Sequence, residues 1–238
     1  MNLLLLLSEN MQSETLAQVS GRQLKHLHTT LTTKVGDHLC VGLLNGKIGT
    51  AKVTQLDTQQ VTLEIDWHSE APAALPLTLV IGLPRPKMLK RIIQTATTMG
   101  VKQLYFIHAW KVEKSFWQSP WLTDEKILEN CILGLEQAKD TLLPEIHLKR
   151  RFKPFVEDEL PTISQNTRKL LAHPGEPTAC PINIQEQATL VIGPEGGFTP
   201  YEVEKFKECG FESVHLGERI LRVETAVPAL IARLFCPA

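Results

Sequence analysis

Residues 191–200, Val-Ile-Gly-Pro-Glu-Gly-Gly-Phe-Thr-Pro, decide the fold class of this chain. An apolar strand predicted over residues 189–192 runs into a glycine-rich loop, and a helix is predicted to begin just after it. Thr199 can cap this helix, Pro200 suits its first position, and Glu202 completes a capping box. A buried strand, a short loop and a capped helix in this order are typical of an α/β sheet.

The same alternation continues on both sides of this stretch. Further strands are predicted at residues 77–83, 103–108, 168–172 and 213–216. Further helices are predicted at residues 88–99, after Thr123, and at 224–235, where Pro228 should be tolerated only near the first turn. The alternation predicts a mostly parallel sheet with helices on both faces.

The first seventy residues have a different, β-rich pattern. Residues 3–7 could resemble a signal peptide, but the start lacks basic residues and the apolar run is short, which favours a buried strand. The strands predicted at 39–44 and 48–56 flank Asn45-Gly46, a strong hairpin signal, and another strand is predicted at 61–65. A short helix is predicted around residues 21–31, and a proline-containing linker follows at 69–76. We therefore predict two domains, 1–70 and 71–238.

Composition limits the function classes. The 238 residues carry a formal net charge of −1 and are 43% hydrophobic, which predicts a packed core and argues against broad phosphate binding. The five cysteines form no Cys-x-x-Cys pair, so we expect neither a zinc site nor disulfides. A metal site is not expected, because the ligand types do not cluster. A reducing cytoplasm is the simplest setting.

Three loops that follow predicted strands could hold a ligand. They are residues 171–176, 193–199 and 216–226, each with at least one glycine. The middle loop lacks the Lys-Ser/Thr of a P-loop and the Gly-x-Gly-x-x-Gly pattern, so it does not indicate a phosphate-rich cofactor. A tight turn, or in the last loop a solvated charge run, would explain each loop taken alone. Together they predict a crevice with apolar walls and backbone polar groups, which suits an adenine ring and an amino-acid tail.

Two basic clusters could contact phosphates, although solvated surface is the usual explanation for such clusters. One contains Arg85, Lys87, Lys90 and Arg91, and the other contains Lys149, Arg150, Arg151 and Lys153.

Two motifs resemble those of one family. They are Ile192-Gly193-Pro194-Glu195-Gly196-Gly197-Phe198-Thr199 and Leu216-Gly217-x-Arg219-Ile220-Leu221-Arg222-x-Glu224-Thr225-Ala226. They resemble the ribosomal RNA small-subunit methyltransferase E family of the SPOUT superfamily, and weaker similarity covers most of the chain. The resemblance implies an α/β, SPOUT-type knotted parallel-sheet methyltransferase domain preceded by a small PUA-like β-barrel that binds RNA. It also implies a homodimer and methylation of N3 of a uridine in 16S rRNA of the small ribosomal subunit.

The resemblance further implies S-adenosylmethionine as cofactor. The positions that it assigns to the cofactor are Leu171, His173, Gly175, Ile192, Gly193, Pro194, Glu195, Gly196, Leu216, Gly217, Ile220, Leu221, Arg222, Thr225 and Ala226. Arg222 could stabilise charge on the uridine carbonyls, and Glu195 or Glu224 could accept the imide proton. We expect Gly196→Val to abolish cofactor binding by filling the space that the ligand needs.

The chain departs from the family pattern at several positions. The family usually has arginine at Thr32, glutamate at Thr98, and Gly-Arg or Asn-Arg at Lys139-Asp140. These losses leave a second hypothesis open, a divergent relative that methylates another RNA or binds RNA without turnover. A third hypothesis, a nucleotide-handling α/β enzyme unrelated to RNA, fits the acidic balance but not the paired motifs.

Overall fold

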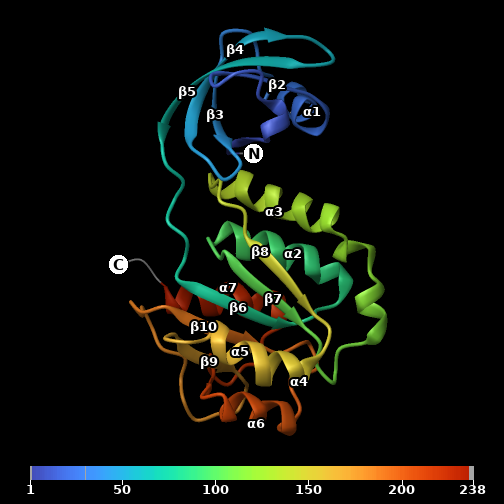
Figure 1. Cartoon of the computed structure of the whole chain (residues 1–238), viewed down its shortest axis with the longest axis vertical. Helices are drawn as coiled ribbons and strands as arrows, with labels where there is room; N and C mark the ends of the chain where they lie inside the picture. Colours follow the sequence, from blue (N-terminus) through green and yellow to red (C-terminus); the bar gives the residue numbers. More distant parts are fainter. Residues whose placement is uncertain (1, 30, 236–238) are drawn as a thin grey trace. The chain divides into compact units, whose positions relative to one another are not determined.

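The computed structural model describes residues 2–29 and 31–235 (Figure 1). Contacts divide the chain into two compact units. Unit 1 contains Met1–Ala73 and Ile132–Leu143, and unit 2 contains Ala74–Cys131 and Pro144–Ala238. Nothing in the sequence indicated that residues 132–143 pack with the first unit, and the two-domain division at residue 70 stays a prediction.

Unit 1 is built on a five-stranded mixed sheet. Its elements are β1 (Leu4–Leu6), η1 (Ser8–Asn10), β2 (Leu16–Val19), α1 (Gly21–Thr29), β3 (His38–Leu43), β4 (Ile48–Leu56) and β5 (Val61–Ser69). The strand order is β1-β3-β4-β5-β2, and only the β1–β3 pairing is parallel. The predicted hairpin turn is present, with Asn45 at φ 57°. The sheet confirms the β-rich reading, whereas a closed PUA-like barrel stays a prediction.

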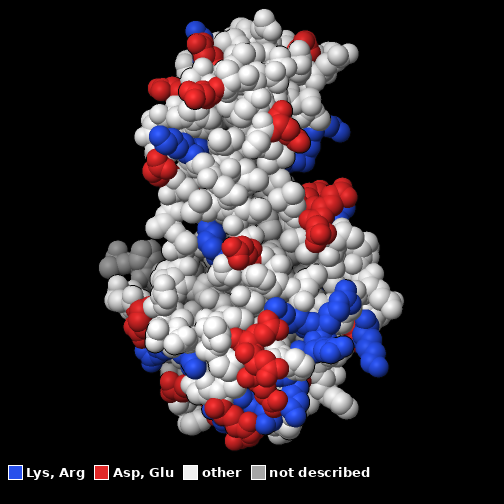
Figure 2. Space-filling model, viewed as in Figure 1, with Lys and Arg blue, Asp and Glu red and all other residues white. Residues whose placement is uncertain are grey.

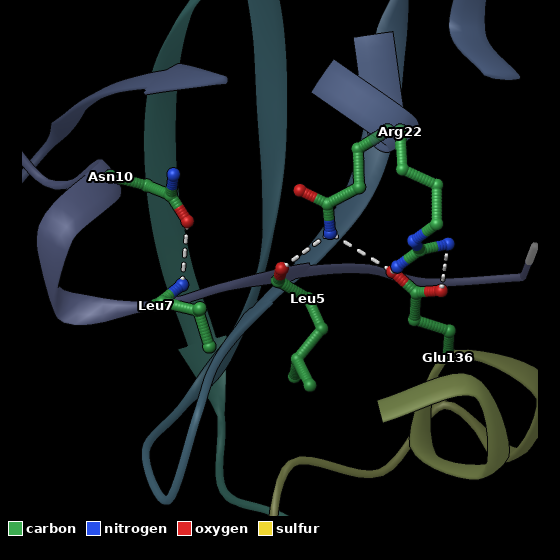
Figure 3. Close-up of polar contacts among 6 residues, drawn as sticks. Leu5, Leu7, Asn10, Arg22 and Glu136 are labelled. Carbon is green, nitrogen blue, oxygen red and sulfur yellow. Dashed lines mark hydrogen bonds and ion pairs between the residues drawn. The ribbon is translucent and has the colours of Figure 1, made fainter. Parts of the chain in front are cut away.

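A buried carboxylate fastens residues 132–143 within unit 1. Both terminal nitrogens of Arg22 donate to the Glu136 carboxylate at 3.0 Å, and Gln23 Nε2 donates to it at 2.9 Å (Figure 3). Glu136 is 2% exposed, and its backbone oxygen also accepts from the N–H groups of Asn2 and Leu3. A buried charge is tolerated only when paired in this way, so this segment is an integral part of unit 1.

Unit 2 is an α/β unit with a six-stranded parallel sheet. Its strands are β6 (Leu77–Gly82), β7 (Gln103–Ile107), β8 (Glu145–Lys149), β9 (Arg168–Ala172), β10 (Ala188–Ile192) and β11 (Glu212–Val214). Its helical elements are α2 (Pro86–Thr98), η2 (Lys114–Gln118), η3 (Pro120–Leu122), α4 (Phe152–Pro154), η4 (Phe155–Glu159), α5 (Leu160–Ile163), α6 (Pro200–Glu208) and α7 (Val223–Leu234). Helix α3 (Asp124–Ala138) begins in unit 2 and, from Ile132, belongs to unit 1. The strand order β11-β9-β10-β6-β7-β8, with every pairing parallel, confirms the predicted sheet.

Helices cover both faces of this sheet. Every residue of β10 is buried, which requires cover on each side. Figure 1 shows α7 behind the sheet and α5 in front of it, and Phe152 of α4 packs edge-on against Phe206 of α6 with ring centroids 5.5 Å apart. The capping box at the start of α6 is present as predicted. The prediction that a proline is tolerated only near the first turn of the closing helix is wrong for Pro228. It lies at the sixth position of α7, and the helix continues past it to Leu234.

Candidate active site

The three predicted loops converge because their strands are neighbours. The order β11-β9-β10 places three carboxyl strand ends side by side at one edge of the parallel sheet. A cavity of about 280 Å³ opens there, and residues of all three loops line it. Ligands of open α/β sheets bind in such a place, outside the carboxyl ends of the strands.

The loop after β10 forms the first wall. Gly197 N–H donates to Pro194 O at 2.7 Å, and Gly197 has φ +69°, a conformation that favours glycine. Pro194 in turn packs closely on the end of β6, since a Cβ placed on Gly82 would lie 2.5 Å from Pro194 Cδ. The absence of a side chain at Gly82 therefore allows this loop its position.

The loop after β11 forms the second wall. His215 Nδ1 accepts the Gly217 N–H at 2.8 Å, and Gly217 has φ +119°. Ile220 lines the cavity and is 80% exposed. Arg222 is the N-cap of α7 but makes no side-chain cap hydrogen bond. The first N–H groups of α7 thus lack the side-chain acceptor that Thr199 supplies to α6, and an anionic group could use them.

The loop after β9 forms the third wall. Ala172, His173 and Pro174 line the cavity. His173 N–H donates to Val214 O at 2.9 Å, which extends the pairing of β9 and β11 to the cavity edge. This wall is therefore fixed by the sheet itself.

Residues after β6 and β7 form hydrogen bonds with the glycine-rich loop. Arg85 N–H donates to Glu195 Oε1 at 2.9 Å, and Lys111 Nζ donates to Gly196 O at 2.7 Å. Glu202, 3% exposed, accepts from Trp110 N–H at 2.7 Å and from the backbone N–H and hydroxyl of Thr199 at 2.8 and 2.9 Å. The loop is thereby preorganised before any ligand arrives.

Most residues expected to bind the cofactor line this cavity. Those that do are His173, Ile192, Gly193, Pro194, Glu195, Leu216, Gly217, Ile220, Leu221, Arg222 and Ala226. Leu171, Gly175, Gly196 and Thr225 are outside the lining, as is Glu224. Leu171 is fully buried in β9, and a Cβ on Gly196 would meet Lys111 Cδ at 2.9 Å. The absence of a side chain at Gly196 therefore allows the close approach of Lys111. The predicted loss of cofactor binding in Gly196→Val would then act through a clash with Lys111 that displaces the loop, and not by direct filling of the cavity.

Sequence reasoning missed nine lining residues. They are Ala172, Pro174, Gly197, Phe198, Val214, His215, Arg219, Val223 and Leu230. Most are direct neighbours of predicted positions. Leu230 follows Ala226 by one helical turn, so the i, i+4 spacing could have identified it.

The two basic clusters differ in how far their charge is neutralised, and neither lines the cavity. Lys149 pairs with Glu159, Lys153 lies 3.8 Å from Glu157, and Arg150 stacks on the Trp117 ring at 5.0 Å. In the α2 cluster, Lys90 lies 5.3 Å from the centroid of the Trp121 ring. Its Arg85, Lys87 and Arg91 side chains have no carboxylate partner among the described residues. Figure 2 shows cations and anions mixed over most of the face that it presents, with one group of cations gathered on the right flank of unit 2, so any phosphate contact must be local.

The described residues contain no group of three or more histidine, cysteine, aspartate or glutamate side chains placed to hold a metal ion. No helix in the described ranges has the length and apolar character needed to span a bilayer.

The fold and the cavity define an α/β protein with a ligand site at the carboxyl ends of parallel strands. The family model described as an RNA methyltransferase domain matches residues 71–235. Ribosomal RNA small subunit methyltransferase E of Treponema pallidum is 30% identical over 213 residues, which cover 87% of this chain and 80% of the relative. The chain therefore belongs to the ribosomal RNA small subunit methyltransferase E family.

Solved structures agree on the fold. The methyltransferase E of Neisseria gonorrhoeae, bound to S-adenosylmethionine, aligns with a TM-score of 0.75 at 23% identity over 98% of this chain and 95% of that one. A Legionella pneumophila protein in complex with the same cofactor aligns with a TM-score of 0.77 at 22% identity over 97% of this chain and 95% of that one. At these identities the likeness is one of fold.

Proposed function

We propose that this chain transfers a methyl group from S-adenosylmethionine to N3 of a uridine in 16S rRNA of the small ribosomal subunit. One observation carries the proposal. In a chain of this family, three neighbouring strand ends enclose one cavity, and residues of both motifs of the resemblance, the glycine-rich loop and the Leu216–Ala226 segment, line it.

The cavity suits the cofactor by its chemistry. Ile192, Leu216, Ile220, Leu221 and Leu230 offer apolar surface to a flat base, and the uncapped first turn of α7 offers N–H groups to a carboxylate. When bound, the cofactor supplies a methyl group on an electrophilic sulfonium. The chain must hold the uridine in line with it, which is a task of positioning.

Two side chains at the cavity are suited to the proton and charge changes. Arg222 is exposed at the rim and can donate to the uridine carbonyls as the imide loses its proton. Glu195 lines the cavity, and its Oε1 is oriented by the Arg85 N–H while Oε2 has no partner among the described residues. Glu224 lies outside the lining. We therefore assign the proton acceptor to Glu195 rather than Glu224.

The unpaired cations of α2 are proposed to contact RNA phosphates. Arg85, Lys87 and Arg91 are exposed, and Arg85 is joined through its backbone to the cavity residue Glu195. Lys90 completes this cluster. Cations without a protein carboxylate can neutralise phosphates without first breaking an ion pair.

The finer features of the family are also proposed for this chain: a PUA-like RNA-binding barrel in unit 1, a trefoil knot near the carboxyl end, a homodimer and a cytoplasmic location. The mixed sheet of unit 1 supports the first. Residues 178–184 support the second, since Cys180 N–H donates to His215 O and Ile184 N–H donates to Leu234 O, which binds this segment to both ends of the 215–234 region.

Two departures favour keeping the divergent relative as a second candidate. Asp140, where the family usually has arginine, is 3% exposed and its Oδ1 accepts from Leu142 N–H at 2.9 Å. Thr32 is exposed but neutral. Both positions therefore lack a cation that could contact RNA.

Labelled cofactor, small ribosomal subunits and mapping of the modified base test the proposal directly. Glu195→Gln keeps an acceptor for Arg85 N–H but removes the base, so kcat should fall by about 10²–10⁴ while cofactor affinity holds. Glu224→Gln is the matched control and should change kcat little. Methyl transfer to another RNA would select the divergent relative, and equal losses in both variants would remove the assignment of Glu195.

A further inference from the structure

We propose that Trp110 is a stacking platform for an unpaired RNA base next to the nucleotide that enters the active site. The inference rests on the proposed function, because it takes RNA as the substrate. Its starting observation is that Trp110 is 82% exposed, the largest exposed fraction among the exposed large hydrophobic residues of the described chain.

The other three tryptophans are held by neighbours. Trp67 Nε1 donates to Glu14 O at 2.8 Å, and Trp117 is 8% exposed and donates to His108 Nδ1 at 2.9 Å. Trp121 lies beneath the Lys90 ammonium. The Trp110 indole has no hydrogen bond or ring contact with any described residue. An exposed indole leaves its aromatic face free for a ligand to stack on.

The backbone beneath Trp110 is nevertheless rigid. Trp110 and Lys111 are the central residues of a turn closed by the Val112 N–H and Ala109 O at 2.9 Å, and Ala109 and Val112 are buried. The Trp110 N–H is fixed on the buried carboxylate of Glu202. A fixed turn that presents a free indole resembles a preorganised contact rather than a mobile loop.

This turn, residues 109–112, is joined to the active site. It follows β7, whose carboxyl end lies at the same edge of the sheet as the cavity. Lys111 Nζ donates to Gly196 O, and the residues on either side of Gly196, Glu195 and Gly197, both line the cavity. A base on Trp110 would therefore lie beside the nucleotide in the cavity, which fits a target that must be splayed out of its stack.

Charge favours RNA over a protein as the occupant. The segments 84–88, 108–114 and 193–197, which include the first turn of α2 and the start of η2, carry the cations Arg85, Lys87, Lys111 and Lys114 against the carboxylates Glu113 and Glu195. Arg85, Lys87 and Lys114 have no carboxylate partner among the described residues. An aromatic ring among unpaired cations is how proteins bind single strands.

Binding of a fluorescein-labelled single-stranded RNA and of small ribosomal subunits tests the inference without requiring turnover. Trp110→Ala should weaken both by roughly 5- to 150-fold, Trp110→Phe should retain most of the affinity, and Trp110→Leu should resemble Ala because stacking needs an aromatic face. Ile182→Ala, which removes another exposed apolar side chain, is the matched control. Stacking involves no charge, so the slope of log affinity against log salt concentration should be the same in Trp110→Ala as in the wild type. Lys114→Gln should reduce this slope by about 1, because it removes a phosphate contact.

Three results would overturn the inference. One is wild-type RNA affinity in Trp110→Ala. Another is a matching loss of S-adenosylmethionine affinity in calorimetry, which would mean that Trp110 only supports the Gly196 loop. The third is a change of oligomeric state in sedimentation with RNA affinity intact, which would make a second copy the occupant. If the wild-type protein shows no methyl transfer but binds RNA in a way that depends on Trp110, the proposed function is refuted and the inference about Trp110 is supported.

Discussion

Gly82→Ala should displace the glycine-rich loop and weaken cofactor binding. A Cβ at this position would lie 2.5 Å from Pro194 Cδ and 2.6 Å from Pro194 N. Carbon atoms in contact sit about 3.5–4.0 Å apart, so Pro194 must move by about 1 Å. Overpacking of this kind costs about 1–3 kcal/mol of stability, and a 1 Å misplacement in an active site can cost about 10²-fold in rate. Pro194 and its neighbours Gly193 and Glu195 line the cavity, so the shift acts directly on the site.

The assay is calorimetric titration with S-adenosylmethionine beside a urea denaturation curve. Gly42→Ala is the matched control, because its Cβ would lie 2.5 Å from Thr141 Cγ2, a contact within unit 1. We expect both variants to lose comparable stability and only Gly82→Ala to lose affinity, by about 10- to 100-fold. Wild-type affinity in a Gly82→Ala protein that is destabilised like Gly42→Ala would refute the reasoning.

Three further predictions concern stability and reactivity. Glu202→Gln should lower the free energy of unfolding in urea by about 1.5–3 kcal/mol, because Trp110 and Thr199 donate hydrogen bonds to this buried carboxylate. Glu204→Gln, on the exposed side of the same helix, should change it by under about 0.5 kcal/mol, and equal effects of the two substitutions would contradict the prediction. Lys139→Gly should raise that free energy by up to about 1 kcal/mol, since Lys139 has φ +55°, whereas Lys139→Ala should not; a loss with glycine would show that the lysine side chain matters. Burial raises the pKa of the Cys131 thiol to about 11, so iodoacetamide at pH 8 should not label it in the native protein, and rapid labelling seen by mass spectrometry would contradict the prediction. The stability that comes from keeping this thiol protonated in the folded state should be lost as the pH rises from about 9 through 11.

The fold was predictable where strands are buried on both faces. Five of the six strands of unit 2 follow from apolar runs, and β10 is buried at every residue. β8 was missed because it is an edge strand with polar residues at both ends, Glu145 and Lys149, and none of its five residues is fully buried. β2 was missed for the same reason, since it lies at the edge of the unit 1 sheet and its first residue, Leu16, is exposed.

The site was predictable as loops but not as individual contacts. The alternation of strands and helices along the chain does not give the order of the strands in the sheet. Any order in which the strands before the three loops are neighbours, however, brings those loops together in one crevice. The side chains within a loop do not follow the period of a helix or strand, so the sequence alone does not separate Gly196 and Leu171 from the residues that line the cavity. Glu202 shows the limit most clearly. Its capping box with Thr199 is local and was predicted, whereas its bond to Trp110 spans 92 residues and carries no local signal.

The departures from the family pattern also gain a physical meaning. Lys139 adopts a left-handed conformation, which explains why glycine or asparagine is usual there. Asp140 is buried and accepts from Leu142 N–H, and the next residue, Thr141, donates to Gly46 O, so this segment satisfies its polar groups within unit 1. An arginine restored at Asp140 would have to replace a buried acceptor, and it would lower stability before it could add a phosphate contact. The RNA contacts proposed for this chain therefore have to come from cations elsewhere. Arg85 and Lys87 have no carboxylate partner among the described residues, and Arg85 is joined through its backbone to the cavity residue Glu195, so these two are the first to test.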